Sequence, residues 1–193
     1  GALKERAAKM AEAYVGSVTM GVGQFCTNPA IVVGLESPEL SEFISTAATH
    51  AEKVAPQSML HSGICKAYDS GTEAWKQIPN LKLAGESADP TSPTASQAAC
   101  RIFSTQLDVL EQNEDLRREV FGPCSIIASG RSKEDILRYA ADLEGQLTAA
   151  IHGTEQDLAD YAPLIRILER KVGRIIFNGF GTGIEVCPSM HHG

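Results

Sequence analysis

The stretch Cys124-Ser125-Ile126-Ile127-Ala128 is followed after a short joint by Ser132-Lys133-Glu134-Asp135. The first of these is a short apolar run, which is typical of a buried strand. The second has the Ser-x-x-Asp pattern in which two side chains cap the start of a helix. Apolar residues continue at helical spacing until Gly145. The stretch therefore predicts a strand that leads directly into a helix.

The same order is repeated toward the end of the chain. Residues 147–151 predict a second strand, and Thr154-Glu155-Gln156-Asp157 predicts a second capped helix, which we expect to be kinked at Pro163. Residues 174–178 predict a third strand. Strands that alternate with helices across short joints are typical of an α/β fold. We expect a doubly wound, mostly parallel sheet with helices on both faces.

The first part of the chain fits this fold. Residues 30–35 predict a buried strand, and Ser37-Pro38-Glu39 predicts the start of a helix with proline in its first turn. We expect a further helix over roughly 57–77, a short strand over 81–84 and an extended apolar run over 99–110.

Composition limits the possible classes of protein. The chain has 193 residues, of which 43% are hydrophobic, so one domain with one substantial core is expected. A formal net charge of -7 does not indicate a nucleic-acid partner. No apolar run approaches the roughly 20 residues that a membrane span needs. The 5 cysteines include no C-x-x-C pair, which favours a reducing, cytoplasmic location over a disulfide framework.

Cys26 is the most distinctive of these cysteines. Apolar residues at helical spacing over 3–18 predict a helix that ends near Gly21 or Gly23, so Cys26 lies on irregular backbone beyond it. A cysteine on a loop is accessible for nucleophilic attack, although most unpaired cysteines are small buried hydrophobes. The negative end of the preceding helix disfavours a thiolate, so this helix would not activate the sulfur.

Several other sequence patterns give little indication of function. The glycines of 179–183 imitate a dinucleotide-binding loop, but position 184 is isoleucine and no helix is predicted next. His61 and Cys65 have no further ligand near in sequence, and Cys187, His191 and His192 lack metal-site spacing. We therefore expect no metal site.

Three segments carry a family resemblance. We call Gly23-Gln24-Phe25-Cys26-Thr27-Asn28-Pro29 the cysteine block, Glu119-Val120-Phe121-Gly122-Pro123 the glutamate block, and residues 178–187 the C-terminal block. In this order they resemble the signature segments of the aldehyde dehydrogenase superfamily, so the expected fold is of its catalytic-domain type. The first and last blocks are most similar to the branch that oxidises 2-oxoglutarate semialdehyde (2,5-dioxopentanoate).

The resemblance implies a role for individual residues. Cys26 matches the nucleophile, which forms a thiohemiacetal and then a thioester with the aldehyde. Glu119 matches the residue that binds the nicotinamide ribose of NAD or NADP, and Phe121 matches the aromatic residue beside the nicotinamide. By the same resemblance the aldehyde pocket corresponds to Phe25, Thr27, Phe180 and Glu185, with core packing as the alternative for the two phenylalanines.

The resemblance also implies that residues 1–193 are a catalytic-domain fragment of a larger, homo-oligomeric enzyme. The family's coenzyme-binding domain, general-base glutamate, oxyanion-hole asparagine and C-terminal tail have no counterpart in this sequence. We therefore expect the isolated chain to be inactive. One alternative is a noncatalytic binding or assembly domain of the same fold. A thiol hydrolase is a further alternative, but the five histidines show no triad order that would activate Cys26.

Overall fold

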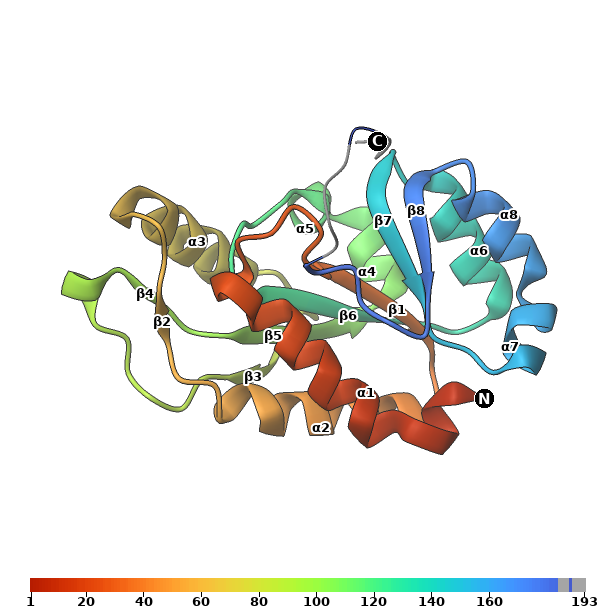
Figure 1. Cartoon of the computed structure of the whole chain (residues 1–193), viewed down its shortest axis with the longest axis horizontal. Coiled ribbons are helices and arrows are strands. Elements are labelled where there is room, and N and C mark those ends of the chain that lie inside the picture. Colours follow the sequence, from red (N-terminus) through yellow and green to blue (C-terminus); the bar gives the residue numbers. More distant parts are fainter. Residues whose placement is uncertain (184–187, 189–193) are drawn as a thin grey trace.

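The computed structural model describes residues 1–183 and residue 188, and its centre is a four-stranded sheet (Figure 1). The strand order is β1 (Ile31–Leu35), β6 (Cys124–Gly130), β5 (Arg101–Gln106) and β3 (Lys82–Glu86). β1 and β5 run parallel to β6, with Ile31 and Phe103 both opposite Ile126, whereas β3 pairs antiparallel with β5. The expected mostly parallel sheet of an α/β fold is confirmed.

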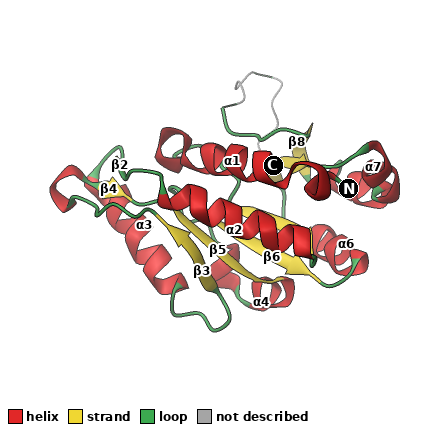
Figure 2. Ribbon diagram, turned by 90° about the horizontal axis from the view of Figure 1, so that it is seen from below, coloured by secondary structure: helices red, strands yellow, loops and turns green. Residues whose placement is uncertain are grey.

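Helices cover both faces of this sheet, as expected. α1 (Ala2–Thr19) and α2 (Pro38–Glu52) pack on one face, and Figure 2 shows α2 in front of the strands. α3 (Ser62–Trp75), α4 (Leu107–Gln112) and α6 (Lys133–Asp142) pack on the other face. Successive strand residues point to opposite faces, so Ile102 packs with α1 and α2 while Phe103 packs with α3 and α4. α5 (Glu114–Arg117) is a single turn beside α4.

The last predicted strands form a separate layer. β7 (Gln146–Ile151) and β8 (Val172–Phe177) pair in parallel, and among the described residues they form a two-stranded sheet of their own. In Figure 1 this pair stands nearly upright while β5 and β6 lie nearly horizontal. α7 (Glu155–Asp160) and α8 (Ala162–Leu168) connect the two strands, and α8 packs on α6.

The predicted helix starts are confirmed. Ser37 accepts a hydrogen bond from the Leu40 backbone N–H at the start of α2, with Pro38 in the first turn. Ser132 and Asp135 form a reciprocal capping box at the start of α6. Thr154 and Asp157 form the same arrangement at the start of α7. Each cap satisfies backbone N–H groups that have no partner within the helix.

Three sequence predictions were wrong in their limits. Residues 57–61 are not helical, because β2 (Gln57–Ser58) pairs with β4 (Gln97–Ala98) and His61 caps α3 from outside. Residues 107–112 form α4 rather than extended chain, because their buried residues Leu107 and Leu110 stand at helical spacing. Two short helices replace the expected kinked one. Pro163 lies in the first turn of α8, where its missing N–H costs nothing.

Two short 3-10 segments complete the fold, η1 (Met20–Gly23) directly after α1 and η2 (Pro93–Ala95) before β4. In the part of the chain that the structure describes, no helix combines the length and apolar character needed to cross a membrane.

Candidate active site

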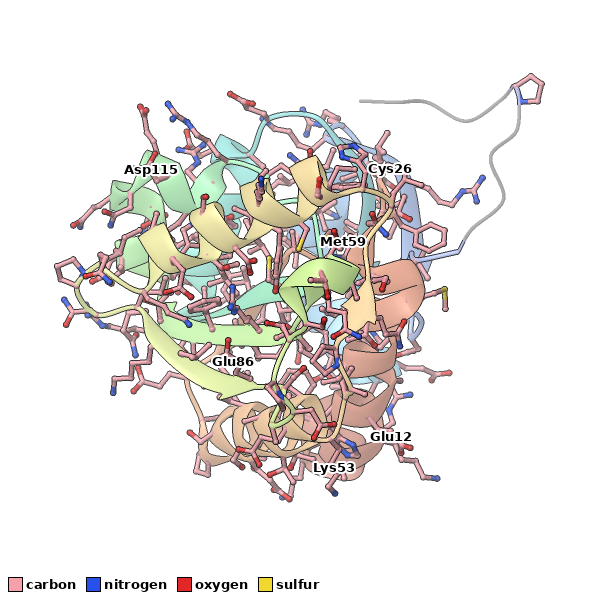
Figure 3. The ribbon with its side chains drawn as sticks, turned by 90° about the vertical axis from the view of Figure 1, so that its left-hand side faces the viewer. Glu12, Cys26, Lys53, Met59, Glu86 and Asp115 are labelled. Atoms are coloured by element: carbon pink, nitrogen blue, oxygen red, sulfur yellow. The ribbon has the colours of Figure 1, made fainter. Side chains whose placement is uncertain are left out.

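Cys26 lies in the loop between α1 and β1, on a tight turn. The Asn28 backbone N–H donates to the Phe25 carbonyl oxygen at 3.0 Å, so Cys26 and Thr27 are the two central residues of the turn. Cys26 is exposed (Figure 3). The sulfur is therefore accessible to a ligand from solvent, unlike that of a core cysteine.

The other described cysteines differ from Cys26 in environment. Cys65, Cys100 and Cys124 are all buried. Burial raises the pKa of Cys100 to about 12 and raises that of Cys124 further still. Burial, assisted by the Asp69 carboxylate, also raises the pKa of Cys65. A thiol held protonated is a weak nucleophile, so these three side chains are suited to packing.

The backbone that precedes Cys26 is strained. Gly21, Val22 and Gly23 have φ values of 56°, 59° and 66°, so three consecutive residues are left-handed. Glycine adopts this conformation readily, but a β-branched residue such as Val22 does so only under constraint. A side chain at Gly21 would also meet the Phe25 ring at 2.6 Å. This segment reverses the chain sharply after α1 and brings the cysteine block back toward the sheet.

The glutamate block lies directly against the cysteine block. A Cβ atom on Gly23 would stand 2.2 Å from the carbonyl carbon of Gly122, so the two backbones touch where both residues lack side chains. The Asn28 side-chain amide donates to the Gly122 carbonyl oxygen at 3.0 Å. Of the residues predicted from resemblance, Glu119 is exposed and Phe121 is half-buried. The fold thus brings together two blocks that are far apart in sequence.

Both blocks lie at the amino ends of parallel strands. The cysteine block precedes β1 and the glutamate block precedes β6, and β1 runs parallel to β6. Ligand sites of doubly wound sheets usually lie at the opposite, carboxyl edge. That general rule would have placed the site at the wrong edge for Cys26 and Glu119, and it applies only to Asn178, which follows β8.

The described part of the C-terminal block, residues 178–183, runs alongside α1 toward the cysteine block. Asn178 accepts hydrogen bonds from the Arg6 guanidinium at 2.6 Å and from the Gly153 backbone N–H at 3.0 Å. Phe180 is half-buried and packs its ring 6.2 Å from that of Tyr14 on α1. This contact is one of core packing, whereas Phe25 is 36% exposed beside Cys26.

The same block reaches the Cys26 turn through Thr182. Its hydroxyl accepts from Ser17 at 2.7 Å and donates to the Thr27 carbonyl oxygen at 3.4 Å. Thr27 itself is buried. The next residues of the block, among them the predicted Glu185, lie outside the described residues, as do Cys187, His191 and His192.

Sequence reasoning missed the residues that hold these blocks together. In the sequence Asn28 is one member of a motif, and no motif predicts a role for Tyr68 or Thr182. The Tyr68 ring occupies the position that a Gly122 side chain would need, with its Cδ2 2.3 Å from the ideal Cβ. Glycine in the glutamate block was the available signal, because it indicates a close approach by another group. Among the described residues, no group of three or more His, Cys, Asp or Glu is arranged to hold a metal ion.

Two curated proteins are similar to this chain along its whole length. The alpha-ketoglutaric semialdehyde dehydrogenase of Acinetobacter baylyi is 38% identical over 193 residues, which are 100% of this chain and 36% of that protein. Alpha-ketoglutaric semialdehyde dehydrogenase 2 of Azospirillum brasilense is 36% identical over 192 residues, again 100% of this chain and 36% of the relative. The chain thus spans about a third of the length of both relatives. No family model matches it.

Solved structures share the fold. Betaine aldehyde dehydrogenase from Staphylococcus aureus superposes with a TM-score of 0.74 at 13% identity, covering 91% of this chain and 36% of that one. Aldehyde dehydrogenase C from Pseudomonas syringae, solved with NAD+ and octanal, gives 0.73 at 17% identity, covering 91% and 37%. The fold is thus that of aldehyde dehydrogenases. The sequence similarity confirms the predicted resemblance of this chain to the aldehyde dehydrogenase superfamily, and within it to relatives named for alpha-ketoglutaric (2-oxoglutarate) semialdehyde.

Proposed function

We propose that this chain is the catalytic-cysteine domain of a longer aldehyde dehydrogenase that oxidises 2-oxoglutarate semialdehyde to 2-oxoglutarate with NAD or NADP. The observation that carries the proposal is the contact between the exposed Cys26 turn and the glutamate block. The substrate comes from the two curated relatives, which are named for this aldehyde.

In the proposed mechanism the Cys26 thiolate attacks the aldehyde carbon and forms a thiohemiacetal. The backbone N–H of Cys26 would stabilise the oxyanion that develops in this step. A nicotinamide cofactor held by Glu119 and Phe121 would supply the hydride acceptor that this thiohemiacetal needs to become a thioester on Cys26. Water then hydrolyses the thioester, releases the acid and returns the free thiol.

The residues of the glutamate block fit the head of such a cofactor. Glu119 is exposed, and a carboxylate there can accept hydrogen bonds from ribose hydroxyls. Phe121 is half-buried two residues later and offers an aromatic face for packing. Gly122 ties both residues to the Cys26 loop, because it touches Gly23 and bonds to Asn28. We propose that the remaining contacts to the cofactor, and the general base, belong to the rest of the longer protein.

A noncatalytic domain of the same fold explains the site less well. Such a domain has no use for an exposed thiol on a strained loop. Backbone strain of this kind tends to be retained where function requires it. Three consecutive left-handed residues, with Val22 among them, stand immediately before the Cys26 turn.

The proposal is tested by replacing the nucleophile. In the full-length protein, Cys26→Ala should reduce turnover of 2-oxoglutarate semialdehyde to less than about a hundredth of the wild-type rate, because no covalent intermediate can form. Formation of the reduced nicotinamide, followed by absorbance with NAD and with NADP, is the measurement. Cys65→Ala is the matched control, since Cys65 is buried and should not be needed for turnover. A Cys26→Ala variant that stays active would contradict the assignment.

The same assay tests whether the isolated chain holds a complete active site. The 193-residue chain alone should give no sustained turnover, because the residues that bind most of the cofactor are proposed to lie elsewhere. Sustained turnover by the isolated chain would show that its site is complete. A panel of semialdehydes in the full-length protein, with 2-oxoglutarate semialdehyde expected to give the highest kcat/KM, tests the branch.

A further inference from the structure

One side-chain amide bridges the two blocks of the candidate site. The Nδ2 group of Asn28 lies 3.0 Å from the carbonyl oxygen of Gly122 and 3.4 Å from that of Gly23. The side chain is half-buried, so these bonds are partly shielded from competition with water. An amide nitrogen carries two N–H donors, which suits it to bridge two acceptors.

Each acceptor is close in sequence to a residue with a proposed role. Gly23 precedes Cys26 by three positions, and Gly122 follows Glu119 by three. Asn28 is also the last residue of the Cys26 turn, where its backbone N–H donates to the Phe25 carbonyl. One residue therefore connects the start of the cysteine block, the turn that carries the thiol and the glutamate block.

The glutamate block packs against Tyr68 of α3. The Tyr68 ring lies against Gly122, and its hydroxyl donates to the Ala99 carbonyl oxygen at 2.6 Å. Tyr68 is only 1% exposed, and the Arg101 guanidinium lies over its ring at 5.5 Å from the centroid. Gly122 is thus held between a fixed aromatic ring and the Gly23 backbone. The remaining freedom is displacement of one backbone past the other, which the Asn28 amide opposes.

We propose that Asn28 is a positioning residue that fixes the Cys26 thiol relative to the cofactor-binding Glu119, an inference that rests on the proposed dehydrogenase function. Asn28 would act only through the two glycine carbonyls and the turn, without contacting the substrate. Positioning matters in this reaction because the carbon bound to sulfur must face the hydride acceptor. A displacement of about 1 Å can reduce such a rate by about 100-fold.

The nature of the bonds predicts a graded series of variants. Asn28→Ala removes both donors, and we expect kcat in the full-length protein to fall about 10- to 100-fold. Asn28→Asp replaces the donor with a carboxylate that faces two carbonyl oxygens, so its loss should be larger. Asn113→Ala is the matched control, because Asn113 donates an equivalent amide bond to the Val109 carbonyl at 2.7 Å within the α4 region. Comparable losses of kcat in Asn28→Ala and Asn113→Ala would overturn the proposal.

A double-mutant cycle separates positioning from simple destabilisation. If Asn28 acts by aligning Glu119 with Cys26, Glu119→Gln should cost at least threefold less in kcat when Asn28 is already alanine. Additive losses would mean that the two residues act independently and would overturn the proposal.

A measurement without turnover distinguishes this proposal from the proposed function. The alkylation rate of Cys26 by iodoacetamide is compared with and without saturating NADP or NAD. In the wild-type protein the cofactor should change this rate by at least threefold, whereas in Asn28→Ala the change should be lost. An identical cofactor response in both proteins, or no response in the wild type, would refute the coupling. Failure of the dehydrogenase function would appear separately, as wild-type protein that responds to cofactor but does not oxidise aldehyde.

Discussion

The four-stranded sheet and the β7–β8 layer differ in how completely their residues are buried. Every residue of β6 is buried, and Ile102, Phe103 and Ile126 have no exposed surface. By contrast, none of the residues of β7 and β8, all of which are described, is buried, and α7 contributes no buried residue. The first region is held by two apolar clusters, one on each face of the sheet, while the second is held mainly by its own pairing and by α8 on α6.

The three blocks are attached to regions that differ in packing, so we expect them to differ in rigidity. The cysteine and glutamate blocks lead directly into β1 and β6, so they are fixed to the densely packed region. The C-terminal block emerges from β8 and reaches the site by separate contacts of Asn178, Phe180 and Thr182 along α1. We therefore expect the Cys26–Glu119 arrangement to be rigid and residues 178–183 of the C-terminal block to be more adjustable.

The largest expected effect tests the packing contrast directly. Phe103 is fully buried and forms a T-shaped pair with Trp75, with 5.5 Å between the ring centroids, so Phe103→Ala should lower the free energy of unfolding by about 3–5 kcal/mol. Ile175 in β8 is half-buried, and Ile175→Ala should cost only about 1–2 kcal/mol. Urea unfolding of both variants is the measurement. Equal losses would show that β8 contributes to stability as much as the central sheet does.

A smaller effect is expected at the glycines. Gly122 has a φ of 155°, and a Cβ there would stand 2.3 Å from the Tyr68 ring, so Gly122→Ala should cost about 1–3 kcal/mol. Gly179 belongs to the C-terminal block, and among the described residues a Cβ there meets only Ile176, at 3.3 Å. Gly179→Ala should therefore change stability by less than about 0.5 kcal/mol. A larger loss in Gly179→Ala than in Gly122→Ala would reverse the contrast between the blocks.

Local signals explain how much of this fold was predictable. The helix starts at Ser37, Ser132 and Thr154 were predicted because capping depends on residues only three positions apart. The short helix α4 was missed because its apolar run has no cap of its own, and Gln106 at its N-cap makes no side-chain capping bond. The separation of β7 and β8 from the main sheet was also missed, since strand pairing depends on the whole fold.

The candidate site was likewise predictable in part. The family resemblance predicted roles for Cys26 and Glu119, but the contact of Gly23 with Gly122 joins segments about a hundred residues apart, and the glycines indicate a close approach without indicating its partner. The bridging role of Asn28 was unpredictable for the same reason, because its acceptors are backbone carbonyls, which every residue has.

The smallest expected effect compares the two capping boxes in acid. Hydrogen bonds from Arg138 and Ser132 lower the pKa of Asp135 in α6, and bonds from Thr154 lower that of Asp157 in α7. A carboxyl whose folded pKa lies below its unfolded value of about 3.9 contributes stability above that value. The contribution is lost as the pH falls through the folded pKa, so the window lies below about pH 4. Asparagine can still accept the capping bond but carries no charge, so Asp135→Asn should flatten this acid-dependent loss.

The two regions should respond differently to that change. α6 packs on the central sheet through Ile136 and Tyr139, so its cap contributes to global unfolding. α7 buries no residue, so loss of its cap should appear mainly as local opening. We would measure the urea midpoint of each variant between pH 2 and 5. The midpoint should depend less on pH in Asp135→Asn than in Asp157→Asn. Asp89 is an exposed loop residue, so Asp89→Asn is the control. If Asp157→Asn flattens the global profile as much, then α7 unfolds together with the central sheet, and the β7–β8 layer is more tightly coupled to the rest of the molecule than its packing indicates.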